Sequence, residues 1–152
     1  MKQDVLPFFF KDLKESYSHE IEQTPTSVSK DANKTILCTS TCKIEKSLNS
    51  IKLVKSSNAG YYTPDINTLF ESANILSDEF DICAILLTGI GADGVNGMKL
   101  LKDNGAYTIA ESEASAPVFG MPRSAIEANA TCSVKSLDEI ISFLKKEDFV
   151  SL

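Results

Sequence analysis

The stretch Cys-Ala-Ile-Leu-Leu-Thr-Gly-Ile-Gly-Ala-Asp-Gly-Val-Asn-Gly, residues 83–97, decides the fold. Its first five residues are continuously apolar, which is typical of a strand buried on both faces of a parallel sheet. The glycines and the Asp-Gly pair that follow favour a sharp turn into a helix. The stretch therefore predicts a strand, a turn and a helix. The turn should lie at the carboxyl end of the sheet, where α/β proteins place their sites.

The segments on either side continue this alternation. Apolar periodicity and capping residues predict helices over residues 65–76, 93–103, 122–128 and from Ser136 onward. Ser136 and Glu139 form a capping box at the last of these helices. Strands are predicted over residues 83–87, 106–110 and 132–134. Helices and strands in strict alternation predict an α/β fold with a parallel sheet.

The residues before 65 have a different texture. An apolar stripe predicts a helix over residues 5–16. Residues 22–34 are polar and are predicted to form a loop with one short strand at its start. Residues 35–38 and 51–54 are short β-type runs, and we expect them to pair as an antiparallel ribbon.

Composition narrows the class of protein. The chain has 152 residues, which is one domain of ordinary size. Its net charge of −6 argues against nucleic acid and anionic membrane surfaces as partners. The sequence has neither a signal peptide nor a run of about 18 apolar residues that could span a membrane, so a cytoplasmic protein is expected. The four cysteines are expected to be reduced thiols, without a metal or cofactor.

Three interpretations of the glycine-rich turn follow from its residues. Gly89, Gly91 and Gly94 match the pattern of dinucleotide-binding folds, in which Glu111, at the end of the next strand, would bind a ribose. Asp93 argues against this alternative, because a carboxylate at the helix N-terminus competes for the amides that a pyrophosphate needs.

The second interpretation uses Asp93. A carboxylate at a strand-to-helix turn, held ionised by helix amides, is suited to orient a catalytic histidine. A third possibility is that Asp93 is only the N-cap of its helix and that the glycines only form the turn. The sequence has a single histidine, His19.

Several motifs in register resemble the catalytic domain of the chemotaxis protein-glutamate methylesterases. They are residues 86–94, 97–98, 105–110, 113–115 and 118–123, with a near-gapless match through about residue 128 and a weaker one back toward Val5. The resemblance implies a doubly wound, mostly parallel, Rossmann-like sheet with an antiparallel ribbon. It also implies a Ser-His-Asp triad that hydrolyses glutamyl methyl esters on methyl-accepting chemoreceptors, with glutamine deamidation in many members.

The same resemblance implies roles for particular residues. Asp93 matches the triad aspartate, and no cofactor is implied. Ile90, Gly91 and Met121 are expected to contact substrate.

The departures from the family pattern concern the rest of the triad. The family's Ser-Thr-Gly-Gly stretch is absent, and its histidine would directly precede Met1. His19 does not match and is expected to lie on the surface. The family's Ala-Pro-Gly-x-x-His pattern is replaced over residues 38–43, and Thr63 stands where an arginine is usual.

These departures lead to an expectation for the whole chain. Residues 1–152 are expected to form a single, N-terminally truncated methylesterase catalytic domain, without the first βαβ unit and without a receiver domain. Such a chain should be inactive alone, because the serine and histidine supply the chemistry, and its exposed sheet could self-associate. The alternative from another class is a non-catalytic module that binds receptors.

Overall fold

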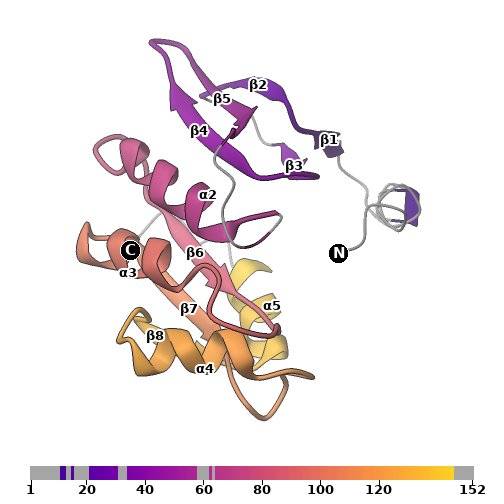
Figure 1. The fold of residues 1–152 in the computed structure, drawn as a ribbon, viewed down its shortest axis with the longest axis vertical. Helices are drawn as coiled ribbons and strands as arrows, with labels where there is room; N and C mark the ends of the chain where they lie inside the picture. Colours follow the sequence, from indigo (N-terminus) through magenta and orange to yellow (C-terminus); the bar gives the residue numbers. More distant parts are fainter. Residues whose placement is uncertain are drawn as a thin grey trace.

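The computed structural model describes residues 11–12, 15, 21–30, 34–57, 62 and 64–145. The first part is made of strands: β1 Ile21–Gln23, β2 Thr26–Ser29, β3 Thr35–Leu37, β4 Cys42–Lys46 and β5 Ser50–Lys55. The second part alternates: α2 Ile66–Ala73, η1 Asn74–Leu76, β6 Cys83–Leu86, α3 Val95–Asp103, β7 Tyr107–Glu111, α4 Gly120–Glu127, β8 Ser133–Lys135 and α5 Leu137–Lys145. The predicted alternation from residue 65 onward is confirmed (Figure 1).

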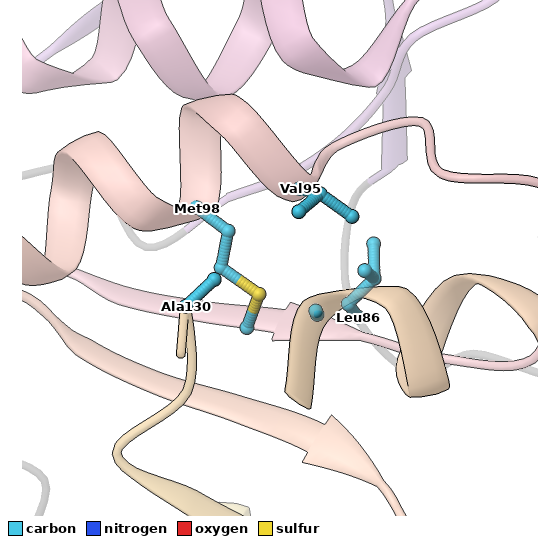
Figure 2. Packing of buried hydrophobic residues seen from close by; sticks show 5 residues of the cluster. Leu86, Val95, Met98 and Ala130 are labelled. Atoms are coloured by element: carbon cyan, nitrogen blue, oxygen red, sulfur yellow. The ribbon is translucent and has the colours of Figure 1, made fainter. Parts of the chain in front are cut away.

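The parallel sheet has the order β6-β7-β8 and helices on both faces. Leu86 of β6 packs with Met98 of α3 and Ala125 of α4 on one face. Figure 2 shows the Met98 side chain directed between Leu86 and Ala130. On the other face, the Phe143 ring of α5 lies 5.6 Å from the ring of Tyr107. Burial of a side chain such as Met98 contributes about 1.5–3 kcal/mol to the free energy of folding. This core therefore fixes the end of β6, where the turn begins.

Local capping explains where the helices begin. The Asp65 side chain accepts a hydrogen bond of 2.8 Å from Thr68 N at the start of α2. Ser136 N donates to Glu139 Oε2 at 2.7 Å, which confirms the capping box before α5. Helix α4 begins at Gly120, two residues before the predicted start, because Gly120 N and Met121 N both donate to Gly89 O. The first turn of α4 thus finds its acceptor in another loop.

The strand pairing in the first part differs from the prediction. β5 pairs antiparallel with β4 and β2, whereas β3 pairs in parallel with β1, so the expected pairing of residues 35–38 with 51–54 is wrong. Residues 22–34 also hold two strands rather than one. β5 pairs with β4 because the turn 47–49 between them is short. In this turn Ser47 N donates to Ser50 O at 2.9 Å. A hairpin closed by so short a loop costs less chain entropy than a pairing with a longer loop.

Helix α2 joins the two parts. In Figure 1 it lies between the three-stranded sheet β2-β5-β4 and strand β6. Ile44 N of β4 donates to Ser72 Oγ of α2 at 2.8 Å, and Asp65 N donates to Thr41 Oγ1 at 3.0 Å. The antiparallel sheet therefore contacts both ends of α2.

Two expectations fall mainly outside the described residues. Of the predicted helix 5–16, only Lys11, Asp12 and Glu15 are described, and they are helical. The expected surface position of His19 also falls outside the described residues. The absence of the first βαβ unit stays a prediction. Within the described ranges, no helix is long and apolar enough to cross a membrane.

Candidate active site

The turn after β6 and the loop before α4 form one unit at the carboxyl end of the sheet. Gly89 N donates to Val118 O at 2.9 Å, and Gly89 O accepts from Gly120 N at 3.0 Å and from Met121 N at 2.9 Å. A Cβ on Gly120 would lie 2.7 Å from Gly89 O, so this close approach requires glycine. The two loops therefore hold each other in place.

Asp93 is the buried carboxylate of this region. Its side chain accepts hydrogen bonds from two backbone amides at the start of α2: Ile66 N at 3.1 Å to Oδ1 and 3.0 Å to Oδ2, and Asn67 N at 3.2 Å to Oδ1. The residue is only 4% exposed. Two donated N–H groups and the positive end of the α2 dipole therefore lie against this carboxylate.

This geometry corrects one interpretation of Asp93. The residue does not cap its own helix, because the N-cap of α3 is Gly94, with φ +85° and no side-chain cap. A left-handed residue at this position turns the chain so that the Asp93 side chain faces α2 instead. The carboxylate thus joins the turn after β6 to a helix that precedes it in the sequence.

The Asp93 carboxylate keeps acceptor capacity. An ionised carboxylate offers about four lone-pair directions. The described contacts take two on Oδ1 and one on Oδ2. Among the described residues, one direction on Oδ2 is left for a further donor such as an imidazole N–H. This is the arrangement that an orienting carboxylate needs.

A close crossing of α2 and α3 fixes the site from behind. Asn67 N donates to Asp93, while Asn67 Oδ1 accepts from Gly97 N at 3.0 Å. A Cβ on Gly97 would lie 2.6 Å from Phe70 Cβ and 2.9 Å from Asn67 O. The glycine lets the two backbones approach, so the position of Asp93 depends on this crossing.

The three expected substrate contacts lie close to one another. Ile90 is at the tip of the turn and is 82% exposed. Gly91 has φ +91°, and a Cβ there would lie 2.8 Å from Tyr62 Oη. Met121 is half-buried against the core, and its Sδ would lie 2.3 Å from a Cβ on Gly89. These three residues belong to the turn after β6 and the first turn of α4, which the hydrogen bonds of Gly89 hold together.

Glu111 has a different place from the one predicted. It is 2% exposed, and both oxygens are engaged: Oε2 accepts from Thr88 N and Oε1 from Ser115 Oγ, each at 2.9 Å. Ser115 Oγ in turn accepts from Leu137 N at 3.0 Å. The alternative in which Glu111 binds a ribose is wrong, because the side chain points into the protein and anchors the glycine-rich turn. No sequence pattern marks this anchoring role.

Burial raises the pKa of two of the cysteines. Burial, and then the neighbouring Cys42, raises the pKa of Cys38 to about 12. Burial, and then Cys132, raises the pKa of Cys83 to about 11. Among the residues that the structure describes, no three His, Cys, Asp or Glu side chains are grouped so that they could hold a metal ion.

Comparison with known proteins gives one consistent match. The sequence profile of the family described as CheB methylesterase matches residues 1–144. A protein-glutamate methylesterase/protein-glutamine glutaminase of Halalkalibacterium halodurans is 37% identical over 98 residues, which are 64% of this chain and 28% of that protein. One of Archaeoglobus fulgidus is 37% identical over 109 residues, which are 68% of this chain and 31% of that protein.

A solved structure agrees with these relatives. The crystal structure of the Thermotoga maritima CheB methylesterase catalytic domain aligns with a TM-score of 0.63 and 27% identity, over 73% of this chain and 60% of that one. The chain thus spans less than a third of these two curated relatives and about three fifths of that catalytic domain. The fold, the ordered motifs and the profile over nearly the whole chain agree, and the chain belongs to the CheB methylesterase family.

Proposed function

We propose that this chain is the aspartate-bearing part of a protein-glutamate methylesterase catalytic domain. The complete catalytic domain acts in the cytoplasm, and its substrates are glutamyl methyl esters on methyl-accepting chemoreceptors. The second activity of that domain is glutamine deamidation. The observation that carries the proposal is the buried Asp93 carboxylate, held by two α2 amides with one acceptor direction left on Oδ2.

The chemistry assigns this chain a supporting part. A serine Oγ attacks the ester carbonyl while a histidine takes the serine proton, and that proton leaves with the methoxide as methanol. Water then attacks the acyl-enzyme, the histidine takes the water proton and returns it to the serine Oγ, and glutamate is released. Asp93 orients the histidine and stabilises its charged form. With a glutamine substrate, ammonia leaves in place of methanol.

The other two triad residues have no matching positions among the 152 residues. The proposal therefore holds that this chain alone hydrolyses no ester. Ile90, Gly91 and Met121 contact the substrate, and the apolar methyl ester suits the side chains of Ile90 and Met121. Glu113 and Arg123, whose Oε1 and Nη2 lie 3.4 Å apart, provide a polar margin at the loop before α4.

A chimera tests the proposal. Residues 34–145 replace the equivalent segment of the Thermotoga maritima CheB methylesterase catalytic domain, which contributes the serine and histidine that the family resemblance implies. Methanol release from methylated receptor is then measured. We expect activity from the chimera and none from the 152-residue chain. Asp93→Asn should lower kcat by about 10⁴-fold, because the histidine loses its orientation.

Asp103→Asn is the matched control. Asp103 lies at the end of α3, is exposed and pairs with Lys99, so its substitution should leave kcat unchanged. Full activity of the Asp93→Asn chimera would remove Asp93 from the triad. Ester hydrolysis by the 152-residue chain would overturn the assignment of the serine and histidine. A chimera that binds receptor without hydrolysis would favour a non-catalytic binding module.

Self-association is a further part of the proposal. Within the described sheets β6 pairs with β7 alone, and Leu87, Ile141 and Leu144 are exposed apolar side chains on and near the sheet. Apolar surface beside a strand edge favours pairing with a second copy. Sedimentation velocity at increasing concentration should show a shift to dimer. If the chain is a monomer both at the highest concentration and after 100-fold dilution, self-association is contradicted.

A further inference from the structure

Hydrogen bonds on both sides of the start of α2 connect the antiparallel sheet to Asp93 through the backbone of residues 65–67. Thr41 precedes β4 and its Oγ1 accepts from Asp65 N at 3.0 Å. Asp65 is the N-cap of α2 and accepts from Thr68 N at 2.8 Å. The next two amides, Ile66 N and Asn67 N, hold the Asp93 carboxylate at 3.0–3.2 Å. Thr41 is thus two contacts away from Asp93.

The amino end of α2 has little freedom to compensate for a loss. The first amides of a helix have no partner within the helix. Here two of them go to Asp93 and the third to Asp65, while the amide of Asp65 itself goes to Thr41. If the Thr41 acceptor is removed, Asp65 N loses its protein partner, and the first turn of α2 is held to the sheet by one hydrogen bond fewer.

Thr41 is itself held firmly. It is 7% exposed, and its carbonyl oxygen accepts from Ser56 N at 2.9 Å, just after β5. The next residue, Cys42, is 1% exposed and its thiol donates to Ser40 O at 3.0 Å and contacts Thr24 Oγ1 at 3.2 Å. Thr41 is therefore an anchor on the sheet rather than a side chain that follows the helix.

We propose that Thr41 is a positioning residue for Asp93. It fixes the first turn of α2, and this turn fixes the carboxylate. The functional meaning of this role rests on the proposed function, because Asp93 matters for catalysis only as the triad carboxylate. The role itself is a property of the hydrogen-bond chain and can be measured without any activity.

The test uses the full 152-residue chain labelled with ¹⁵N. Amide hydrogen exchange is compared between the parent, Thr41→Val and Thr41→Ser. Valine has nearly the shape of threonine but no acceptor, whereas serine keeps the hydroxyl. In Thr41→Val we expect the amides of Ile66 and Asn67 to exchange about five- to tenfold faster, the factor for one net hydrogen bond. Thr41→Ser should restore the parent rates, and the core amides of Met98 and Ile109 should keep theirs.

A matched control and a double variant complete the design. Thr39→Val makes the same chemical change in the same loop, where only the backbone amide of Thr39 is bonded among the described contacts, and should leave the Ile66 rate unchanged. In an Asp93→Asn background, Thr41→Val should change the Ile66 rate less than it does in the parent, because the two residues act on the same amides.

The outcomes separate this inference from the proposed function. An equal rise at Ile66 and at the core amides in Thr41→Val would mean general destabilisation and would overturn the inference. So would unchanged Ile66 and Asn67 rates, or a Thr41→Ser variant that behaves like Thr41→Val. If the chimera then loses activity in Asp93→Asn, the proposed function stands while the positioning role fails. If the Asp93→Asn chimera keeps its activity but the exchange pattern is as expected, the positioning role stands and the proposed function fails.

Discussion

Replacing Gly97 by alanine probes the close crossing of α2 and α3 behind Asp93. The new Cβ would lie 2.6 Å from Phe70 Cβ, 2.9 Å from Asn67 O and 3.1 Å from Glu71 N. Two of these neighbours are backbone atoms of α2, which cannot rotate away as a side chain can. The helices must therefore separate by several tenths of an ångström.

The expected loss of stability combines two opposing effects. Overpacking a well-packed contact costs about 1–3 kcal/mol, and the backbone neighbours put Gly97→Ala near the upper end. Alanine in place of glycine within a helix contributes about 1 kcal/mol in the other direction. The net change is a loss of about 2 kcal/mol in the free energy of unfolding. In a chain of this length it corresponds to a fall of about 4–8 °C in Tm.

Urea unfolding followed by circular dichroism measures this loss. Asn96→Ala is the control, because Asn96 is exposed on the same helix and its substitution improves helix propensity without a new contact. We expect Asn96→Ala to be as stable as the parent or slightly more stable. A Gly97→Ala variant with undiminished stability would refute the reasoning, since the crossing would then have room for a methyl group.

Two further predictions concern the core and the thiols. Met98→Ala should lower the free energy of unfolding by about 2–5 kcal/mol, because Met98 is fully buried in the cluster of Figure 2. Urea unfolding measures this loss. A loss under 1 kcal/mol would contradict the prediction and would mean that the site collapses around the smaller side chain. At pH 8 the exposed Cys132 should be alkylated first, while Cys83 should react about a hundredfold more slowly than a free thiol because burial raises its pKa to about 11. Since the folded chain holds the Cys83 proton more tightly than the unfolded chain, the protonated thiol contributes fully to stability below about pH 9, and this contribution is lost as pH rises toward 11. Unfolding midpoints measured between pH 8 and 11 will report the loss. Rapid alkylation of Cys83 in the folded chain would contradict the raised pKa.

Local sequence signals predicted most of the second part of the chain. The apolar run at residues 83–87, the Asp65 cap and the Ser136–Glu139 box each act within a few residues, so their effect can be derived without knowledge of the fold. The predicted boundaries differ by one or two residues where a distant group intervenes. The clearest case is α4, which begins early because Gly89 O accepts its first amides.

Pairings between distant segments were beyond such signals. The sequence predicts that residues 35–38 and 51–54 pair, but β5 pairs with β4 and β2, and β3 pairs with β1. For Glu111 the end of a strand was correctly located, but its direction into the protein depends on the donors Thr88 N and Ser115 Oγ. Neither donor is visible in the residue pattern around Glu111.

The sequence by itself determined the α/β class, the glycine-rich turn at the carboxyl end of the sheet, and Asp93 as its one carboxylate. It did so because periodicity and caps are properties of neighbouring residues. Only the tertiary structure decided what holds that carboxylate. The amides of α2 lie more than 20 residues before Asp93 in the sequence, and the α2–α3 crossing at Gly97 brings them within hydrogen-bond distance. Thr41, next to a separate sheet, accepts a hydrogen bond from Asp65 N, the amide just before them. The role of Asp93 therefore depends on packing between elements, and such packing is not a property of any single stretch of the sequence.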